Sequence, residues 1–175
     1  GFLSAYRDDL EDRYRNGCVH TVRPSVLPDD LYPDLWLKGI ALEELAAMPV
    51  HRPWLLWVSF PGPHEPFDVP ASWRGARGSV PIPDPEKRPQ EMNFLGDIAQ
   101  PGSCLARKLA RWPEGIPAED LLQLREDYAD HLSLLDSQLG DLLNALALRP
   151  DAGKTSISVC SDHGELLGDW GLLLK

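Results

Sequence analysis

Asp162 and His163 are neighbouring residues whose side chains can both bind one divalent metal ion. Gly164 follows them and lets the backbone turn sharply, because glycine has no Cβ atom. Carboxylate oxygens suit Ca²⁺ or Mg²⁺, and an added imidazole moves the preference towards Mn²⁺ or Zn²⁺. Two ligands do not complete a coordination shell, so further donors must come from elsewhere. The alternative is structural: Asp162 caps the next turn, and His163 is a partly buried, hydrogen-bonded residue.

His64 is the second candidate for chemistry, because Pro63 and Pro66 restrict the backbone around it. A fixed histidine can act as the general acid that protonates a leaving group. The alternative is a structural histidine bonded to a loop carbonyl. Lys175 is the third candidate, since a lysine can neutralise an anionic oxygen as a point charge. Its alternative is a solvated lysine at the surface.

Two short apolar runs precede these polar residues and are predicted to be buried strands. Residues 54–60 lead into the loop that carries His64, and residues 155–160 lead directly to Asp162. Their length and composition are typical of strands covered on both faces in a parallel sheet. Ligand sites in such sheets form beyond the carboxyl ends of the strands, so both loops lie where a site is expected.

Three amphipathic helices are predicted over residues 2–15, over residues 35–48, and from about residue 117 to the turn at Pro150. Asp34 is predicted to cap the second helix, and the leucine stripe of the third is predicted to be core. Strand, crossover helix and strand in this order imply an α/β fold, a parallel sheet flanked by helices.

Composition limits the function classes. The 175 residues carry a net charge of −10 and fit one domain, residues 1–175, with no basic face for nucleic acid. No apolar run is long enough to span a membrane, and three scattered cysteines favour reduced, buried thiols over a disulfide framework. Residues 61–117 are rich in proline and glycine and are predicted to form a long loop. Gly1 is predicted to be an internal position, so the sequence start identifies no compartment, although we slightly favour the cytoplasm.

Two sequence blocks resemble the sulfatase family of the alkaline phosphatase superfamily. One is VSFPGPHEPF at residues 58–67, and the other is VCSDHGELLGD at residues 159–169, followed by Lys175. They occur in the family's order, with its long helix between them, and the resemblance covers roughly residues 30–70 and 116–175. It implies an alkaline-phosphatase-like core with a partial, mostly parallel sheet.

The resemblance also implies a role for each matching position. Asp162 matches a metal-binding aspartate, and His163 matches the adjacent ligand, which is Asn in many sulfatases and His in choline-sulfatase-like and phosphonate-monoester-hydrolase-like members. Lys175 matches the lysine that contacts the sulfate or phosphate oxygens, and His64 the histidine near the leaving-group oxygen. The expected metal is Ca²⁺, with Mg²⁺, Mn²⁺ and Zn²⁺ as alternatives.

The chain departs from the family pattern in two ways. Trp170 stands where many relatives have His, and the C/S-x-P/A-x-R motif that yields the formylglycine nucleophile is absent around Cys18, Cys104 and Cys160. We therefore expect formylglycine in an N-terminal part that precedes this sequence. The chain by itself is expected to show no turnover, while the parent's aldehyde hydrate would attack the ester.

Three functions remain open at this point: a sulfatase fragment, a fragment of a phosphonate monoester hydrolase or phosphodiesterase, and a non-catalytic α/β interaction domain. The expected partner is a small-molecule sulfate, phosphate or phosphonate ester, with no nucleic acid and no membrane; the oligomeric state is open. Trp54, Leu56 and Ile157 are expected to face solvent or a partner, so the isolated chain should aggregate or dimerise. For any of the hydrolases, residues 64, 162, 163 and 175 must converge on one pocket.

Overall fold

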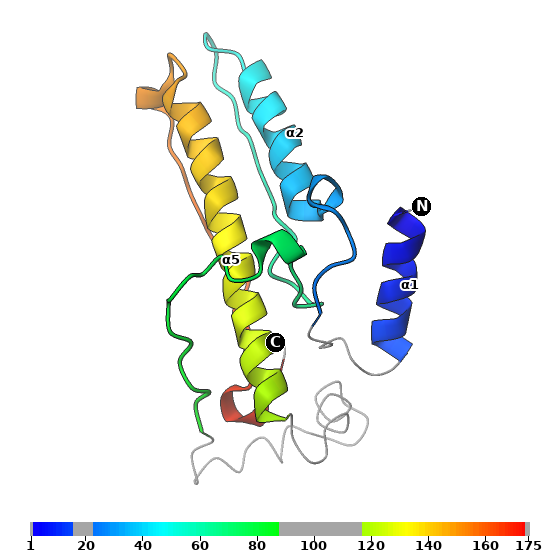
Figure 1. The fold of residues 1–175 in the computed structure, drawn as a ribbon. Helices are drawn as coiled ribbons and strands as arrows, with labels where there is room; N and C mark the ends of the chain where they lie inside the picture. The colour runs from blue at the N-terminus through cyan, green and yellow to red at the C-terminus, as the bar shows by residue number, and fades with distance from the viewer. Residues whose placement is uncertain (1, 16–22, 88–116, 174–175) are drawn as a thin grey trace, which may run out of the picture.

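The computed structural model describes residues 2–15, 23–87 and 117–173, and its main elements are helices (Figure 1). The three long helices are α1 (Phe2–Arg15), α2 (Pro33–Ala47) and α5 (Ala118–Ala147). Single-turn 3₁₀ helices lie between and after them: η1 (Asp29–Leu31), η2 (Ala71–Trp73), η3 (Ala152–Lys154) and η4 (Asp169–Gly171). The three helices predicted from periodicity are thus confirmed, each within about three residues of its expected bounds.

Helix α5 is the central element, against which most other segments pack (Figure 1). Glu119 and Asp120 lie in its first turn, where acidic side chains favour the positive end of the helix dipole. Its buried face is only partly the predicted leucine stripe, because Leu132 is 46% exposed. Four of its seven buried residues are polar: Leu124, Asp127, Asp130, His131, Leu134, Gln138 and Leu142. A helix face that carries this many buried polar groups must supply each of them with hydrogen bonds.

Helix α2 lies beside α5 and runs in the same direction (Figure 1). A salt bridge of 2.9 Å joins Lys38 to Asp141 across the two helices. The prediction that Asp34 caps α2 is wrong, because the helix begins at Pro33, the N-cap residue is Tyr32, and no side chain caps it. Asp34 lies in the first turn, is buried, and is free to bond to other elements.

The predicted parallel sheet is absent from the described residues, which corrects the α/β assignment. Residues 54–60 and 155–160 are extended and run back from the same end of α2 and α5, but neither has a strand partner there (Figure 1). A strand requires a neighbour that takes its backbone N–H and C=O groups, and apolar content alone does not supply one. Neither run is covered on both faces, since Leu55 is 84% and Val159 72% exposed.

The two extended segments also correct the expected exposure of single side chains. Burial alternates along residues 54–60, as in any extended chain, but Trp54 and Leu56 are the half-buried residues. Leu55 and Trp57 are the exposed ones instead. Ile157 is 55% exposed, as expected, whereas Cys160, predicted to be a buried thiol, is exposed.

Two hydrophobic clusters hold the described segments together. The first contains Leu27, Tyr32 and Leu134, with Trp73 packed against it, and so ties the segment before α2 to the middle of α5. The second is built from the buried residues Phe67, Leu124 and Leu173 and the partly buried residues Leu121, Tyr128 and Leu167. Within the described segments, we find no helix with the length and apolar character that a membrane crossing needs.

Candidate functional site

His64 lies on a tight loop that follows the first extended segment. Its backbone N–H donates to the carbonyl of Pro61 at 3.2 Å, which closes a turn. Its side chain is 54% exposed, and Nδ1 lies 2.8 Å from the Glu65 carbonyl and 3.3 Å from Glu65 Oε2. Because a carbonyl can only accept, Nδ1 carries a proton, and Nε2 is the ring nitrogen left for exchange with a ligand.

A buried polar cluster lies directly under this loop, and sequence reasoning missed it. His131 Nε2 lies 2.9 Å from Asp34 Oδ2, and Asp34 Oδ1 accepts the backbone N–H of Gly62 at 3.0 Å. The Tyr32 hydroxyl lies 3.2 Å from His131 Nε2 and donates to the carbonyl of Asp68 at 2.8 Å. His131 and its neighbour Asp130 lie on α5, where charged side chains ordinarily face solvent, but both are buried.

Asp68 extends the buried cluster to helix α1. Its carboxylate lies 3.3 Å from Arg13, whose side chain is fully buried and also pairs with Asp9 at 2.7 Å. Burial raises the pKa of Asp68 to about 6, although the nearby Arg13 and His131 oppose the shift. Burial, followed by the charges of Asp68 and Asp34, also raises the pKa of Tyr32, which therefore remains a neutral hydroxyl.

Asp162 and His163 are side by side and exposed, with side-chain exposures of 84% and 44%. His163 Nε2 lies 3.4 Å from Asp162 Oδ2, Nδ1 lies 2.9 Å from the carbonyl of Gly164, and the backbone N–H of His163 donates to Asp162 Oδ1 at 2.9 Å. A carboxylate beside an imidazole fits two positions of a metal shell. Three or more ligating side chains do not come together anywhere in the described part of the chain. The pair therefore fits as part of a shell that other residues would complete.

The segment after His163 returns to helix α5. Arg125 donates to the carbonyl of Leu167 at 2.7 Å, and Gly168, at φ 94°, donates to the carbonyl of Leu172 at 2.7 Å. Leu172 and Leu173 are buried. Lys175 lies outside the described residues, so its predicted place in the site remains a prediction.

The two sequence blocks meet at the second hydrophobic cluster. Phe67, three residues after His64, packs in it with Leu167 and with Leu173. Its ring also meets Tyr128 edge-on, with centroids 5.8 Å apart. Within the described residues, no hydrogen bond or ion pair joins His64 to Asp162 or His163. The two blocks therefore pack against the same part of α5. The convergence of the predicted site residues on one pocket remains a prediction.

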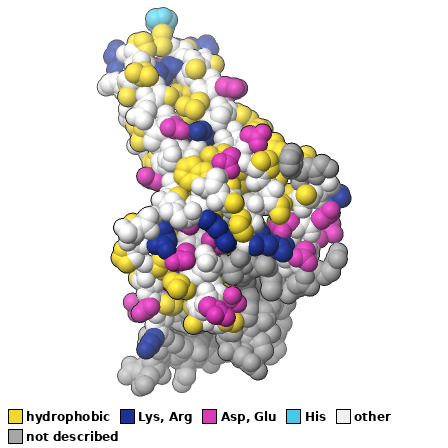
Figure 2. Space-filling view, viewed as in Figure 1, with side chains coloured by type: hydrophobic (Ala, Val, Ile, Leu, Met, Phe, Trp, Pro, Cys, Tyr) yellow, Lys and Arg dark blue, Asp and Glu magenta, His cyan; other side chains and the backbone are white. Residues whose placement is uncertain are grey.

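Carboxylates of α5 anchor the loop after η2. Asp130 accepts the backbone N–H groups of Gly75 and Arg77 at 2.7 and 2.9 Å. Asp127 pairs with Arg74 at 2.6 Å, and burial raises the pKa of its carboxyl against the opposing effect of that arginine. On the face in Figure 2, Lys and Arg side chains are interspersed with Asp and Glu.

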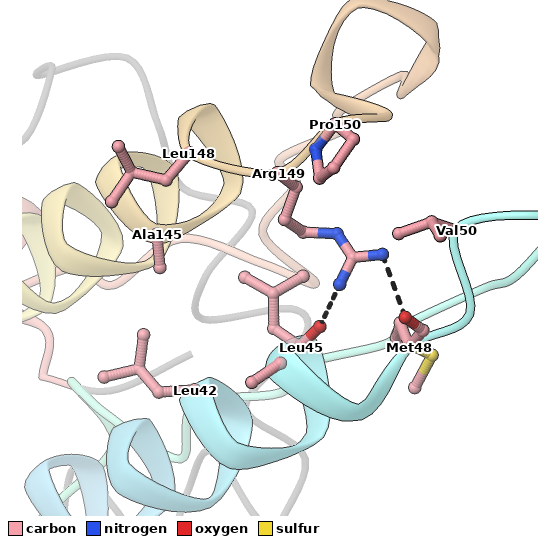
Figure 3. Close-up of a pocket in the computed structure, with 9 residues that line it drawn as sticks. Leu42, Leu45, Met48, Val50, Ala145, Leu148, Arg149 and Pro150 are labelled. Atoms are coloured by element: carbon pink, nitrogen blue, oxygen red, sulfur yellow. Dashed lines mark hydrogen bonds between the residues drawn. The ribbon is translucent and has the colours of Figure 1, made fainter.

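A hollow of about 310 Å³ lies at the C-terminal ends of α2 and α5 (Figure 3). The His64 loop instead contacts Asp34, in the first turn of α2. Its lining is mostly aliphatic: Leu42, Leu45, Ala46, Met48, Val50, Ala145, Leu148, Arg149 and Pro150. Arg149 is already engaged, because it donates to the carbonyls of Leu45 and Met48 at 2.6 and 3.0 Å. At that end of the molecule Arg149 therefore has a structural role, as a brace that joins the end of α5 to the end of α2.

Comparison with known proteins decides the family. A family model described as Sulfatase matches residues 4–174, which include both sequence blocks and the whole of α5. The chain belongs to the sulfatase family. The sulfatase resemblance of residues 58–67 and 159–169 is thereby confirmed.

Several curated sulfatases are similar to this sulfatase chain. A choline-sulfatase of Rhizobium meliloti is 27% identical over 134 residues, which cover 71% of this chain and 24% of the relative. The human iduronate 2-sulfatase is 31% identical over 153 residues, which cover 83% of this chain and 28% of that relative. An arylsulfatase of Clostridium perfringens is 26% identical over 149 residues, which cover 84% of this chain and 29% of that relative. The chain thus spans less than a third of the length of these relatives.

Proposed function

We propose that this chain is part of the catalytic domain of a metal-dependent sulfuric ester hydrolase. The single observation that carries the proposal is the match to the sulfatase family over residues 4–174, because it includes both blocks of site residues. The choline-, iduronate- and arylsulfatase names of the relatives support a sulfate ester as the substrate class. The names of these relatives differ in the alcohol, so the proposal extends only to a small-molecule sulfate ester.

In this proposal, His64 is the general acid that protonates the leaving alcohol. The Glu65 carbonyl holds the Nδ1 proton at 2.8 Å, so a protonated ring carries its transferable proton on Nε2. The Glu65 carboxylate, 3.3 Å from Nδ1, would pair with the positive ring. General acid catalysis of this kind contributes roughly 10²- to 10⁴-fold to the rate.

Asp162 and His163 are the residues of this chain that would hold a divalent ion, which when bound supplies charge stabilisation for the ester's non-bridging oxygens. Lys175 would contact those oxygens as a fixed positive charge. Both assignments follow the family resemblance of each position. The nucleophile is expected in sequence beyond this chain.

The test uses the longer protein that contains this chain, assayed with aryl sulfates whose leaving phenols differ in pKa. His64→Ala should reduce kcat most for the poorest leaving groups, because these need the proton most. His51→Ala, which changes another exposed histidine, is the matched control and should leave kcat within about twofold. A loss that does not depend on the leaving group would remove His64 from the general-acid role.

Two further measurements separate the alternatives. Asp162→Ala should abolish the calorimetric signal of Ca²⁺ or Mn²⁺ binding and the activity together. Wild-type protein that binds no divalent ion would favour a non-catalytic interaction module. Higher kcat/KM on aryl phosphonates or phosphodiesters than on aryl sulfates would instead assign the chain to a phosphorus-ester hydrolase.

A further inference from the structure

We propose that Asp34 and His131 form a buried positioning pair that fixes the backbone of the His64 loop. The inference rests on the proposed function for the role of His64, but its structural part does not. The side chains of Asp34 and His131 are 2% and 4% exposed, and they come from α2 and α5. Both approach one residue of the loop, Gly62, two positions before His64.

The first argument is that the loop offers Asp34 one backbone donor. Pro61 and Pro63 have no backbone N–H, so Gly62 carries the only donor of the Pro-Gly-Pro sequence. That N–H donates to Asp34 Oδ1 at 3.0 Å. A hydrogen bond to a charged carboxylate is roughly twice as strong as one between neutral groups. Asp34 therefore anchors the loop at the one point where its backbone can be held.

The second argument is the space around Gly62. A Cβ atom built there would lie 2.2 Å from His131 Nε2 and 2.8 Å from Asp34 Oδ2. Gly62 has no positive φ, so this position needs glycine for close approach and not for an unusual backbone conformation. The imidazole of His131 therefore packs directly against the backbone of the loop at Gly62.

The third argument is the hydrogen-bond order within the pair. The Tyr32 hydroxyl donates to the Asp68 carbonyl, so towards His131 its oxygen acts as an acceptor. His131 Nε2 therefore carries a proton and shares it between Asp34 Oδ2 at 2.9 Å and the Tyr32 oxygen at 3.2 Å. This arrangement fixes the ring of His131, and through it the carboxylate of Asp34.

These contacts reach His64 through a short, closed piece of backbone. His64 N–H donates to the Pro61 carbonyl, so residues 61–64 form one turn with Gly62 inside it. A displacement of Gly62 must therefore move His64. Asp34 and His131 bond to Gly62, to each other and to Tyr32 and not to the side chain of His64, so they are positioning residues.

The direct test is amide hydrogen exchange and NMR on the ¹⁵N-labelled chain. Asp34→Ala should speed exchange at Gly62 by roughly tenfold or more and shift the His64 ring resonances. Asp34→Asn should restore both in part, because its amide oxygen can still accept from Gly62 while its NH₂ group faces the Nε2 proton of His131. Asp127→Asn is the matched control, since it changes a fully buried carboxylate of α5 that bonds to Arg74 instead. Unchanged Gly62 exchange in Asp34→Ala, or an equal change in Asp127→Asn, would overturn the proposal.

A second readout separates this inference from the proposed function. In the longer protein, Asp34→Ala should lower kcat more than it raises KM and should steepen the dependence of kcat on leaving-group pKa, as His64→Ala does. Asp34→Asn, which keeps the acceptor for Gly62, should reverse part of the loss. If the protein is active and kcat depends on leaving-group pKa equally in the wild type and in Asp34→Ala, the positioning role is refuted. The proposed hydrolase function would be unaffected by that result. A protein without sulfatase activity would refute the function, while the exchange data would still decide whether the pair holds the loop.

Discussion

Replacing Gly62 with alanine is the sharpest perturbation of the loop that carries His64. The new Cβ would lie 2.2 Å from His131 Nε2, 2.7 Å from His131 Cε1 and 2.8 Å from Asp34 Oδ2. Ordinary contact begins at 3.4 Å, so the loop or the imidazole must move by about 1.2 Å. The imidazole is held by Asp34 and Tyr32 and is nearly fully buried, so it has little room to move.

Gly62→Ala should lower the free energy of unfolding in two ways. Overpacking of a filled interior costs about 1–3 kcal/mol, and weakening a buried, charge-assisted hydrogen bond costs about 1.5–3 kcal/mol. The lower entropy of alanine in the unfolded chain returns about 0.4–1 kcal/mol. We therefore expect Gly62→Ala to lower the free energy of unfolding by roughly 2–4 kcal/mol. In a chain of this size that lowers Tm by on the order of 5–10 °C.

Urea denaturation followed by tryptophan fluorescence measures the free energy of unfolding. Gly39→Ala in α2 is the matched control, because a Cβ there meets open space and should stabilise the helix by about 0.5–1 kcal/mol. In a His131→Ala background, Gly62→Ala should cost about 1–2 kcal/mol less than in the wild type, since the ring is gone and only the contact with Asp34 Oδ2 at 2.8 Å remains. Equal midpoints for Gly62→Ala and Gly39→Ala, or an unchanged cost in that background, would refute the reasoning.

Three other outcomes follow from the same packing. The pKa of Asp68 is raised from 3.8 to about 6, so between these values the folded state holds a proton that the unfolded state has lost. The free energy of unfolding should therefore fall by up to about 3 kcal/mol as the pH rises from about 3 to about 7, and Asp68→Asn should flatten this slope in urea titrations. Arg149→Ala removes two carbonyl contacts at the end of α2 and should cost about 2–4 kcal/mol by the same assay; a loss below about 0.5 kcal/mol would contradict the brace. Leu134→Ala should cost about 2–5 kcal/mol and Leu55→Ser less than about 0.5 kcal/mol, because their exposed fractions are 0% and 84%; a large loss for Leu55→Ser would mean that the extended segment is covered.

Helix positions were predictable because their signal is local. Each helical hydrogen bond joins residues four apart, so apolar periodicity and proline placement in one segment suffice to define α1, α2 and α5. The strand predictions for residues 54–60 and 155–160 failed because pairing depends on another segment, and apolar runs do not encode one. Local extension was predictable, but pairing was not.

The sequence by itself determined the family and the residue types of the candidate site, because the blocks around His64 and Asp162 are contiguous motifs. The tertiary structure decided which polar residues lie beneath the loop. Asp34 and His131 are 97 positions apart. In the sequence alone, Asp34 is typical of a helix cap and His131 of a solvated side chain on a helix. Burial makes them partners, because a charge removed from water must find its hydrogen bonds inside the protein, whatever the separation along the chain.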